Sequence, residues 1–441
     1  MFTLLNLIAF FALTWYAVYL LYSKPSYVAL SKTQKVLLTG REKFLLLTIV
    51  TGMLRFADFS ATRLMVWSIL VLSAFLLYRR PPKITPIMAF YIAFILWLGI
   101  SFFWSADTGY AFRTYIKYVY ALLIMLFAAT FVRSKDLIFI AMRWLIITAF
   151  IYSVFLGGLM THILGIWHFY LQGLFWPMST LNDYLAMMSG LSFLLWWRTR
   201  EKKYLLLVGW FFLSAVFQSV RTGLLGIFMV MAIASYVRFR ALALPYIGAI
   251  ALTAILSVLF IPQVREKMFY DPSAVQSVGD LEKVDTTQID SNGRFAMWDW
   301  TLRHLYDPHP LTGSGLGTTQ YVYYETAHPF YPIRVIHNDY VQMLADNGQV
   351  GLILYALFVI IASLSAYREV HSRKPDYLRN TAFLVITSFT AMSVTMMTDN
   401  VVLYVLATFS YPFIFVGLLI AYRRVYASDL RQSLQKSPDE P

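Results

Sequence analysis

The chain has 441 residues, of which 59% are hydrophobic and only 13% are charged, and its formal net charge is +13. This balance excludes an ordinary soluble domain, and long continuous apolar runs exclude a β-barrel, whose strands alternate in polarity. We therefore expect an all-α polytopic membrane protein, because helices satisfy their own backbone hydrogen bonds in lipid. The sequence contains no cysteine, which excludes disulfides, thiolate metal ligands and cysteine nucleophiles.

Apolar runs of roughly membrane-spanning length follow one another along the chain. They lie near residues 3–22, 44–59, 62–78, 85–103, 113–132, 137–158, 180–197, 204–219, 222–237, 242–261, 348–367, 380–398 and 401–422. The runs from residue 44 onward predict about twelve membrane-spanning helices, with one more if residues 3–22 span the membrane instead of lying at its surface. The first run lacks a basic leader and a cleavage site, so we expect a retained helix and not a signal peptide.

Basic residues between these runs predict the orientation. They cluster at Arg79/Arg80/Lys83, Arg133/Lys135, Arg198/Arg200/Lys202/Lys203, Arg238/Arg240, Arg368/Arg373/Lys374 and Arg423/Arg424. These clusters fall in alternate loops, so the positive-inside rule places those loops and the C-terminus in the cytoplasm. The same rule accounts for the net positive charge, and we expect no nucleic-acid binding.

One segment, residues 262–347, lacks an apolar run and falls on the outer, periplasmic side in this topology. Long loops between short-looped helices are usually functional. We therefore divide the chain into an N-terminal membrane bundle (1–261), this large loop (262–347), C-terminal membrane helices (348–425) and a cytoplasmic tail (426–441).

The loop carries the pattern of a short helix. Ser291 or Asn292 is the expected N-cap, and apolar residues recur at helical spacing at Phe295, Trp298, Leu302 and Leu305. Pro308 and Pro310 are expected to end this helix, and glycines 313, 315 and 317 to form a turn. The aromatic residues Trp298, Trp300, Tyr321 and Tyr324 predict either a small loop core or sugar stacking.

Four cations lie at the outer ends of apolar runs, against the positive-inside trend. They are Arg221, in "QSVRTGLLG", Arg265, in "IPQVREKM", and the pair Arg113 and Lys117, which share a helix face. Guanidinium groups bind phosphate oxygens in pairs of hydrogen bonds. These residues therefore predict a site for a lipid-linked pyrophosphate, and contact with lipid headgroups is the alternative.

His337, in "VIHNDYVQMLADNGQVG", is the candidate general base, because imidazole side chains in general titrate near neutral pH. His304, His309 and His328 compete for that role in the same loop, and His162 and His168 lie in another outer loop.

Two more polar positions lie at the outer ends of helices. Asn182, in "STLNDYLAMM", either contacts a sugar or caps the helix that begins there. Asp399, in "MMTDNVVLY", either pairs with an outer arginine, holds His337 or is a turn residue.

Several common site patterns are missing from the sequence. There is no Gly-x-Ser-x-Gly elbow, no Walker loop and no His-x-x-x-His pair, and "GSGLG" follows an expected helix where a dinucleotide fold requires a strand. We therefore expect neither a metal nor any other cofactor.

These motifs together resemble the O-antigen ligase and polymerase superfamily of bacterial membrane glycosyltransferases. The resemblance rests on the order of "TLNDYLAMM", "SVRTGLLG", Arg265, "GRFAMWDW", "HPLTGSGLGT" and "HNDYVQMLADNGQVGLI", and it covers about residues 44–425. Many members have Glu where this chain has Asp346 and Asn347. The family implies about twelve helices and a large periplasmic loop that carries short helices and covers a cavity, in the bacterial inner membrane.

The resemblance also implies a reaction, which is the transfer of a glycan from undecaprenyl pyrophosphate to an acceptor hydroxyl, with inversion and without a metal. On this basis His337 is expected to be the base, Arg221 and Arg265 to bind the pyrophosphate, and Arg294 to be a weaker candidate. The remaining expected substrate contacts are Arg113, Lys117, Asn182 and Asp399.

Within the superfamily we favour the ligase, whose acceptor is the lipid A-core oligosaccharide. The total length and the single dominant loop match a ligase. The alternatives are an O-antigen polymerase and a protein O-oligosaccharyltransferase. A transporter for a lipid-linked sugar is disfavoured, because transporters place their polar residues at the bilayer midplane and these lie at one face.

Overall fold

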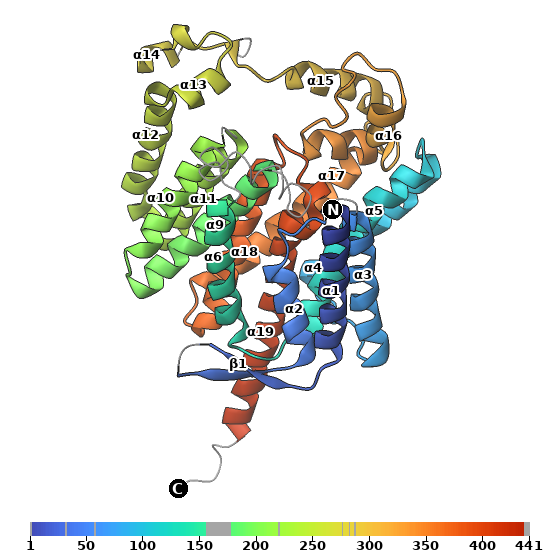
Figure 1. The fold of residues 1–441 in the computed structure, drawn as a ribbon, viewed down its shortest axis with the longest axis vertical. Helices are drawn as coiled ribbons and strands as arrows, with labels where there is room; N and C mark the ends of the chain where they lie inside the picture. Colours follow the sequence, from blue (N-terminus) through green and yellow to red (C-terminus); the bar gives the residue numbers. More distant parts are fainter. Residues whose placement is uncertain are drawn as a thin grey trace.

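The computed structural model describes residues 2–30, 33–56, 59–155, 178–218, 221–275, 277–281, 283–285 and 288–435. His162 and His168 lie outside the described residues. The chain forms a bundle of helices with a small antiparallel hairpin at one end and a group of short helices at the other (Figure 1). The hairpin pairs β1 (Ser26–Ala29) with β2 (Lys35–Leu38). The N-terminus lies toward the end with the short helices, and the C-terminus lies at the hairpin end (Figure 1).

The first half of the bundle follows the predicted apolar runs, with one exception. Its helices are α1 (Phe2–Tyr22), α2 (Gly40–Val50), α3 (Ser60–Leu77), α4 (Pro86–Ser101), α5 (Thr108–Phe131) and α6 (Leu137–Phe155). The run at 44–59 does not become a spanning helix, because α2 has 11 residues and ends at Val50. Its capping box at Thr39 and Glu42 starts the helix earlier than hydropathy suggests.

The second half contains α9 (Met178–Thr199), α10 (Lys203–Phe217), α11 (Arg221–Phe239), α12 (Leu244–Phe260), α17 (Asp339–Val370), α18 (Asp376–Thr395) and α19 (Ser410–Gln435). A 3-10 turn (Val401–Tyr404) and a π-helical turn (Val405–Phe409) precede α19. The apolar stretch of α19 is almost fully buried, and α19 packs against α5 and α18. In contrast, α12 buries only Ser257, so its apolar side chains face outward, as a lipid-contacting helix requires.

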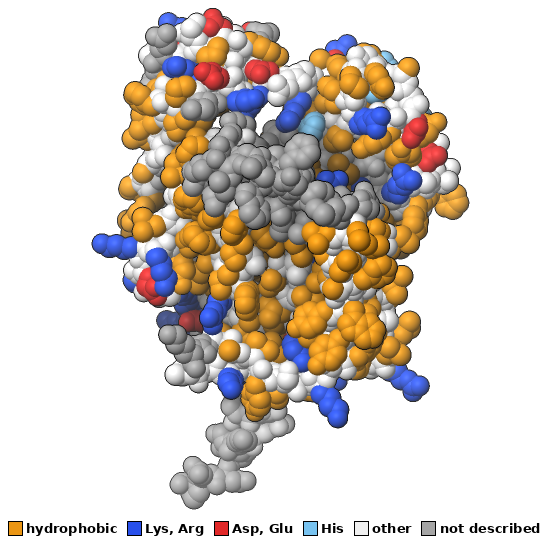
Figure 2. Space-filling view, in the orientation of Figure 1, with side chains coloured by type: hydrophobic (Ala, Val, Ile, Leu, Met, Phe, Trp, Pro, Cys, Tyr) orange, Lys and Arg blue, Asp and Glu red, His pale blue; other side chains and the backbone are white. Residues whose placement is uncertain are grey.

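Eight helical stretches of the described chain are long and apolar enough to cross a membrane. Hydrophobic side chains cover the middle of the face in Figure 2, and lysines and arginines gather toward both ends. The protein is therefore a mostly helical, multi-pass membrane protein. The count of about twelve spans stays a prediction, because α2 and α10 are shorter and α9 and α18 are more polar than these eight stretches.

Three of the six predicted basic clusters meet at the hairpin end. Arg80, Lys83, Arg133 and Arg424, the last from α19, line one cavity there. These three clusters therefore lie on the side opposite the large loop, as the positive-inside rule predicts.

The large loop folds as a string of short helices. These are α13 (Pro262–Met268), a 3-10 turn (Pro272–Ala274), α14 (Val278–Leu281), α15 (Arg294–Thr301), a π-helical turn (Leu302–Tyr306) and α16 (Thr318–Glu325). The predicted helix is thus present, but its N-cap is Gly293, at φ 74°, and neither Ser291 nor Asn292. A small core of Met297, Tyr323 and Ile336 holds this part of the loop together, with Trp300 packed against it.

The last part of the large loop is helical. Asn338 caps α17, and its side chain accepts hydrogen bonds from the backbone N–H groups of Tyr340 and Val341. The backbone leaves the helical conformation at Gly348, where α17 kinks before the apolar run. The kink coincides with the loop boundary that hydropathy predicts at residue 347, and residues 339–347 form a short helix before it.

Candidate functional site

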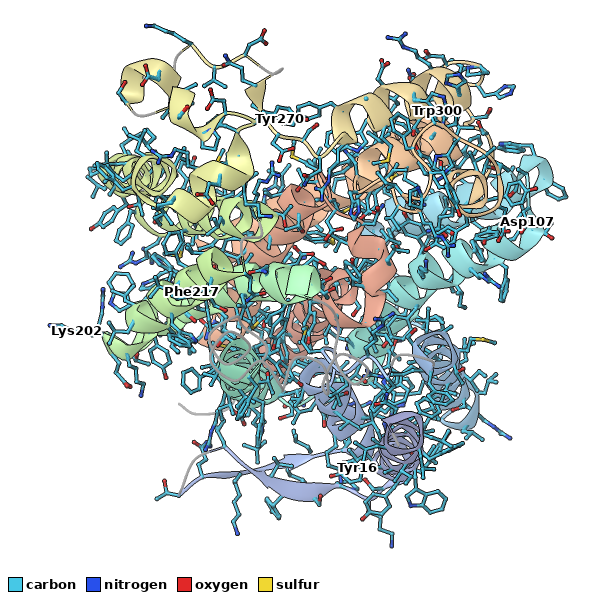
Figure 3. The ribbon with its side chains drawn as sticks, turned by 45° about the horizontal axis from the view of Figure 1, so that its top comes forward. Tyr16, Asp107, Lys202, Phe217, Tyr270 and Trp300 are labelled. Carbon is cyan, nitrogen blue, oxygen red and sulfur yellow. The ribbon has the colours of Figure 1, made fainter. Side chains whose placement is uncertain are left out.

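A cavity of about 510 Å³ lies between α11, α12 and the large loop, and we call it the first cavity. Its polar wall contains three cations, Arg221, Lys267 and Arg294, together with His337 and Asp399. Its other wall is apolar and comes from α11 and α12, with Leu224, Leu225, Phe228, Ala254 and Val258. The site therefore combines a cationic end with an apolar groove. Figure 3 brings the loop end forward, and its labels Tyr270 and Trp300 mark the two halves of the loop above the bundle.

His337 is held from two directions. Its backbone N–H donates to Oδ1 of Asn400 at 2.7 Å, and its Nδ1 lies 3.2 Å from Oδ1 of Asp399. The residue has φ 52°, a left-handed conformation that is uncommon outside glycine and often occurs at functional sites. Its side chain is 35% exposed, whereas that of Asp399 is only 6% exposed. The Nε2 atom is therefore the ring nitrogen that remains for a ligand in the cavity.

A network of buried polar groups fixes the segment around His337. One oxygen of Asp339 accepts from Nδ2 of Asn400 at 3.1 Å, and the other accepts from the backbone N–H of Val402 at 3.1 Å. The backbone N–H of Asp339 donates to the carbonyl oxygen of Met396 at 2.9 Å. These bonds tie the start of α17 to the turn between α18 and α19. That turn also carries Asp399.

Arg294 lies on the other side of Asp399. Its Nη1 donates to the carbonyl oxygen of Thr398 at 2.7 Å. Burial lowers the pKa of Arg294 from its usual value, and the nearby Asp399 carboxylate opposes this shift. Asp399 thus interacts with both Arg294 and His337, and it is the one carboxylate in the described lining, which holds three cations.

Arg221 is the first residue of α11 and is half-buried at the cavity rim. Its Nη1 donates to the backbone carbonyl oxygen of Asp290, and its Nη2 lies 3.8 Å from the Asp290 carboxylate. Asp290 comes just before α15, so this contact joins the bundle to the loop. The helix N-terminus and the guanidinium group both favour an anion at this position.

The structure brings together four of the predicted site residues and separates the others. Arg221, Arg294, His337 and Asp399 line the first cavity. Arg265 does not line it, and its Nη1 donates to the carbonyl oxygen of Leu259 at 3.3 Å, on the adjoining helix.

Asn182 is fully buried in α9 and donates from Nδ2 to Oε1 of Gln218 at 2.8 Å. It thus lies in the interior between helices. The alternative prediction, that Asn182 caps this helix, is wrong because α9 begins earlier, at Met178. Arg113 and Lys117 lie in a different cavity, between α3, α5 and the loop.

His304, His309 and His328 do not line the first cavity, and backbone groups hold the side chains of His304 and His328. Nδ1 of His304 lies 2.8 Å from the carbonyl oxygen of Trp300. His328 is buried, and its Nδ1 accepts from the backbone N–H of Phe330 at 3.2 Å. Among the described histidines of the loop, His337 is the one that reaches the first cavity.

Sequence reasoning missed three residues of this site. Lys267 lies in the same short helix as Arg265 but lines the cavity. Asp290 and Asn400 hold Arg221 and His337, respectively. The sequence offered one indication that these residues belong to the site, which is their position next to predicted features. Asp290 precedes the "SNGR" turn, and Asn400 follows Asp399. Nothing in the sequence specified which distant residue each one contacts.

Residues 206–356, about a third of the chain, match the family model described as O-antigen ligase. The match confirms the resemblance to this superfamily. Arg221, Arg265, Arg294 and His337 all lie within the matched segment, whereas Asp399 lies outside it. No curated protein matches the sequence significantly.

Proposed function

From the O-antigen ligase match of residues 206–356, we propose that this multi-pass membrane protein transfers a glycan from undecaprenyl pyrophosphate to the lipid A-core oligosaccharide. The proposal locates the reaction at the first cavity, on the periplasmic face of the bacterial inner membrane. The division of the chain into an N-terminal bundle (1–261), a large loop (262–347), C-terminal helices (348–425) and a tail (426–441) is part of this proposal. The single observation that carries the chemistry is the His337–Asp399 pair, which lines one cavity together with Arg221 and Arg294.

His337 acts as the general base in this proposal. The acceptor hydroxyl oxygen forms a bond to the anomeric carbon of the donor sugar, and its proton passes to Nε2 of His337. The Asp399 carboxylate, at Nδ1, stabilises the imidazolium that results. The bond between the anomeric carbon and the pyrophosphate oxygen breaks at the same time, and the electron pair leaves with the pyrophosphate. Attack opposite the leaving group inverts the anomeric carbon.

Arg221 and Arg294 bind the departing pyrophosphate. Negative charge grows on this group in the transition state, and fixed guanidinium donors stabilise it without reorganising. We assign Arg294 to this role in place of Arg265, because Arg294 lines the cavity and Arg265 does not. Lys267 adds a third positive charge to the same wall. The apolar wall from α11 and α12 provides a path for the prenyl chain of the donor.

The test begins with deletion of the gene and electrophoresis of the lipopolysaccharide. Loss of a ligase leaves the core without O-antigen, while finished polymer accumulates on the carrier lipid. Plasmid-borne wild type should restore the ladder, His337→Ala should not, and His304→Ala should. His304 is the matched control because it lies in the same loop and makes its bond to the Trp300 carbonyl, away from the cavity.

Three other outcomes would overturn the proposal. Core carrying a single repeat indicates a polymerase, which joins repeat units to one another. Unchanged lipopolysaccharide with loss of a glycosylated protein indicates a protein O-oligosaccharyltransferase. Accumulation of the donor on the cytoplasmic side indicates a transporter of lipid-linked sugar.

A further inference from the structure

Another cavity, of about 470 Å³, adjoins the segment just before His337, and we call it the second cavity. It opens between α3, α5, α16 and residues 334–336. Four cations line it, Arg55, Arg113, Lys117 and Arg334, and its described lining contains no Asp or Glu side chain. The proposed chemistry at the first cavity does not use any of these four residues.

Some cations of the protein pair with carboxylates, as Arg198 does with Asp376 at 2.8 Å and Arg423 does with Glu369 at 2.7 Å. Within the part of the chain that the structure describes, no such ion pair involves Arg113, Lys117 or Arg334. Like charges gathered in a restricted space repel, and a bound anion relieves that repulsion.

The two arginines are oriented by aromatic rings. The Arg113 guanidinium lies 5.3 Å from the Tyr110 ring centre, and that of Arg334 lies 5.6 Å from the Tyr324 ring centre. Both tyrosines also line the second cavity. A ring contact of this kind positions a guanidinium group while leaving its N–H groups for an anion. Lys117 lies on the same face of α5 as Arg113. The carboxylate that interacts with Lys117 electrostatically is that of Asp339.

The two cavities are neighbours. Val335 and Ile336 line the second cavity, and the next residue, His337, lines the first. Gln342 of the second cavity accepts a hydrogen bond from Asn400, which holds His337. Tyr404 of the second cavity is hydrogen-bonded to Ser179 of the first. A substrate in the second cavity therefore lies close to the segment that carries the proposed base.

We propose that the second cavity binds the phosphate groups of the acceptor glycolipid, through Arg113, Lys117 and Arg334, while the first cavity binds the donor pyrophosphate. This inference rests on the proposed function, because it assigns the second of its two substrates. The apolar part of the lining consists of Leu64 and Met65 of α3 and Ile116 of α5. These apolar side chains suit a lipid-anchored molecule. A soluble phosphate would contact only the cations.

The test uses the full chain in nanodiscs of phosphatidylcholine and measures binding without turnover. The probes are a diphosphorylated lipid A, its dephosphorylated form, a prenyl pyrophosphate and inorganic phosphate. The variant is Arg113→Gln/Lys117→Gln/Arg334→Gln. Arg303→Gln is the control, because Arg303 is an exposed loop cation in an ion pair with Asp299, away from both cavities.

The triple variant should bind diphosphorylated lipid A at least about tenfold more weakly than wild type, since charge-assisted hydrogen bonds are lost. Dephosphorylated lipid A should bind weakly to both proteins. Binding of the prenyl pyrophosphate should be unchanged in the triple variant and weakened in Arg294→Gln. Arg303→Gln should behave as wild type in every arm.

Equal lipid A affinity in the wild type and the triple variant would overturn the inference, and so would a loss confined to the prenyl pyrophosphate. Inorganic phosphate that binds as tightly as lipid A would show a soluble-anion site and overturn the lipid assignment. The proposed function fails separately. If transfer proceeds with an unchanged acceptor KM in the triple variant, only this inference is wrong. If the cations govern lipid A binding but no transfer occurs, only the proposed function is wrong.

Discussion

The Nδ1 atom of His337 lies 3.2 Å from Oδ1 of Asp399, a residue 62 positions further along the chain. The two residues flank α17 and α18, so the contact exists only when these helices pack as a pair. A carboxylate at one ring nitrogen orients an imidazole and leaves the other nitrogen for a substrate. This relationship is what distinguishes His337 from the other described histidines of the loop.

Replacing His337 by Ala should abolish most of the transfer activity. A positioned general base contributes roughly 10²- to 10⁴-fold to a rate, so the rate with defined donor and acceptor should fall within that range. Initial rates in purified membranes measure this, with the protein level checked by immunoblot. His304→Ala should retain the wild-type rate. Full activity of His337→Ala would remove the residue from the mechanism.

The substitution Asp399→Asn keeps the shape of the side chain but removes its charge. It should slow transfer about 10- to 100-fold, because a charge-assisted hydrogen bond contributes roughly 1.5–3 kcal/mol. The fall should appear in kcat, while donor binding should change little. Comparing kcat with the affinity for a prenyl pyrophosphate separates these effects. A wild-type kcat would mean that Asp399 only supports the turn.

Arg294→Gln should weaken donor binding about tenfold or more, because Arg294 lines the wall of the first cavity. Arg265→Gln should leave donor binding close to wild type, since Arg265 contacts Leu259 and does not line the cavity. Titration of each variant with prenyl pyrophosphate gives the comparison. A larger loss in Arg265→Gln than in Arg294→Gln would reverse our choice between the two arginines.

Gly348→Ala should destabilise the loop and the helix α17. Gly348 has φ 65°, and a Cβ atom there would collide with the backbone of Leu311 and Thr312. Strain and overpacking of this kind cost roughly 1–3 kcal/mol each. The unfolding temperature in detergent should therefore fall. Gly248→Ala is the matched control, because its Cβ would meet nothing within 4 Å. An equal unfolding temperature for both variants would contradict the prediction.

Much of the fold could be predicted from patterns within short segments. The apolar runs located most of the long helices, since hydropathy depends only on neighbouring residues. The exception at 44–59 arose because the capping box at Thr39 and the end at Val50 give a short helix inside a longer apolar stretch. The prediction of Ser291 or Asn292 as the N-cap of α15 was wrong. Gly293 takes that position because it adopts the left-handed backbone conformation found there.

For the candidate site too, some features follow from the sequence and others only from the tertiary structure. The sequence by itself determined the membrane class, the large loop, the motif around His337 and the position of Arg221 at the end of an apolar run, because each depends on local composition or spacing. Only the tertiary structure decided that Asp399 meets His337, that Arg294 and not Arg265 lines the first cavity, and that Arg113 and Lys117 belong to a second one. The physical reason is that these contacts join residues from separate helices. Their side chains meet through helix packing and loop closure, which no spacing along the chain specifies.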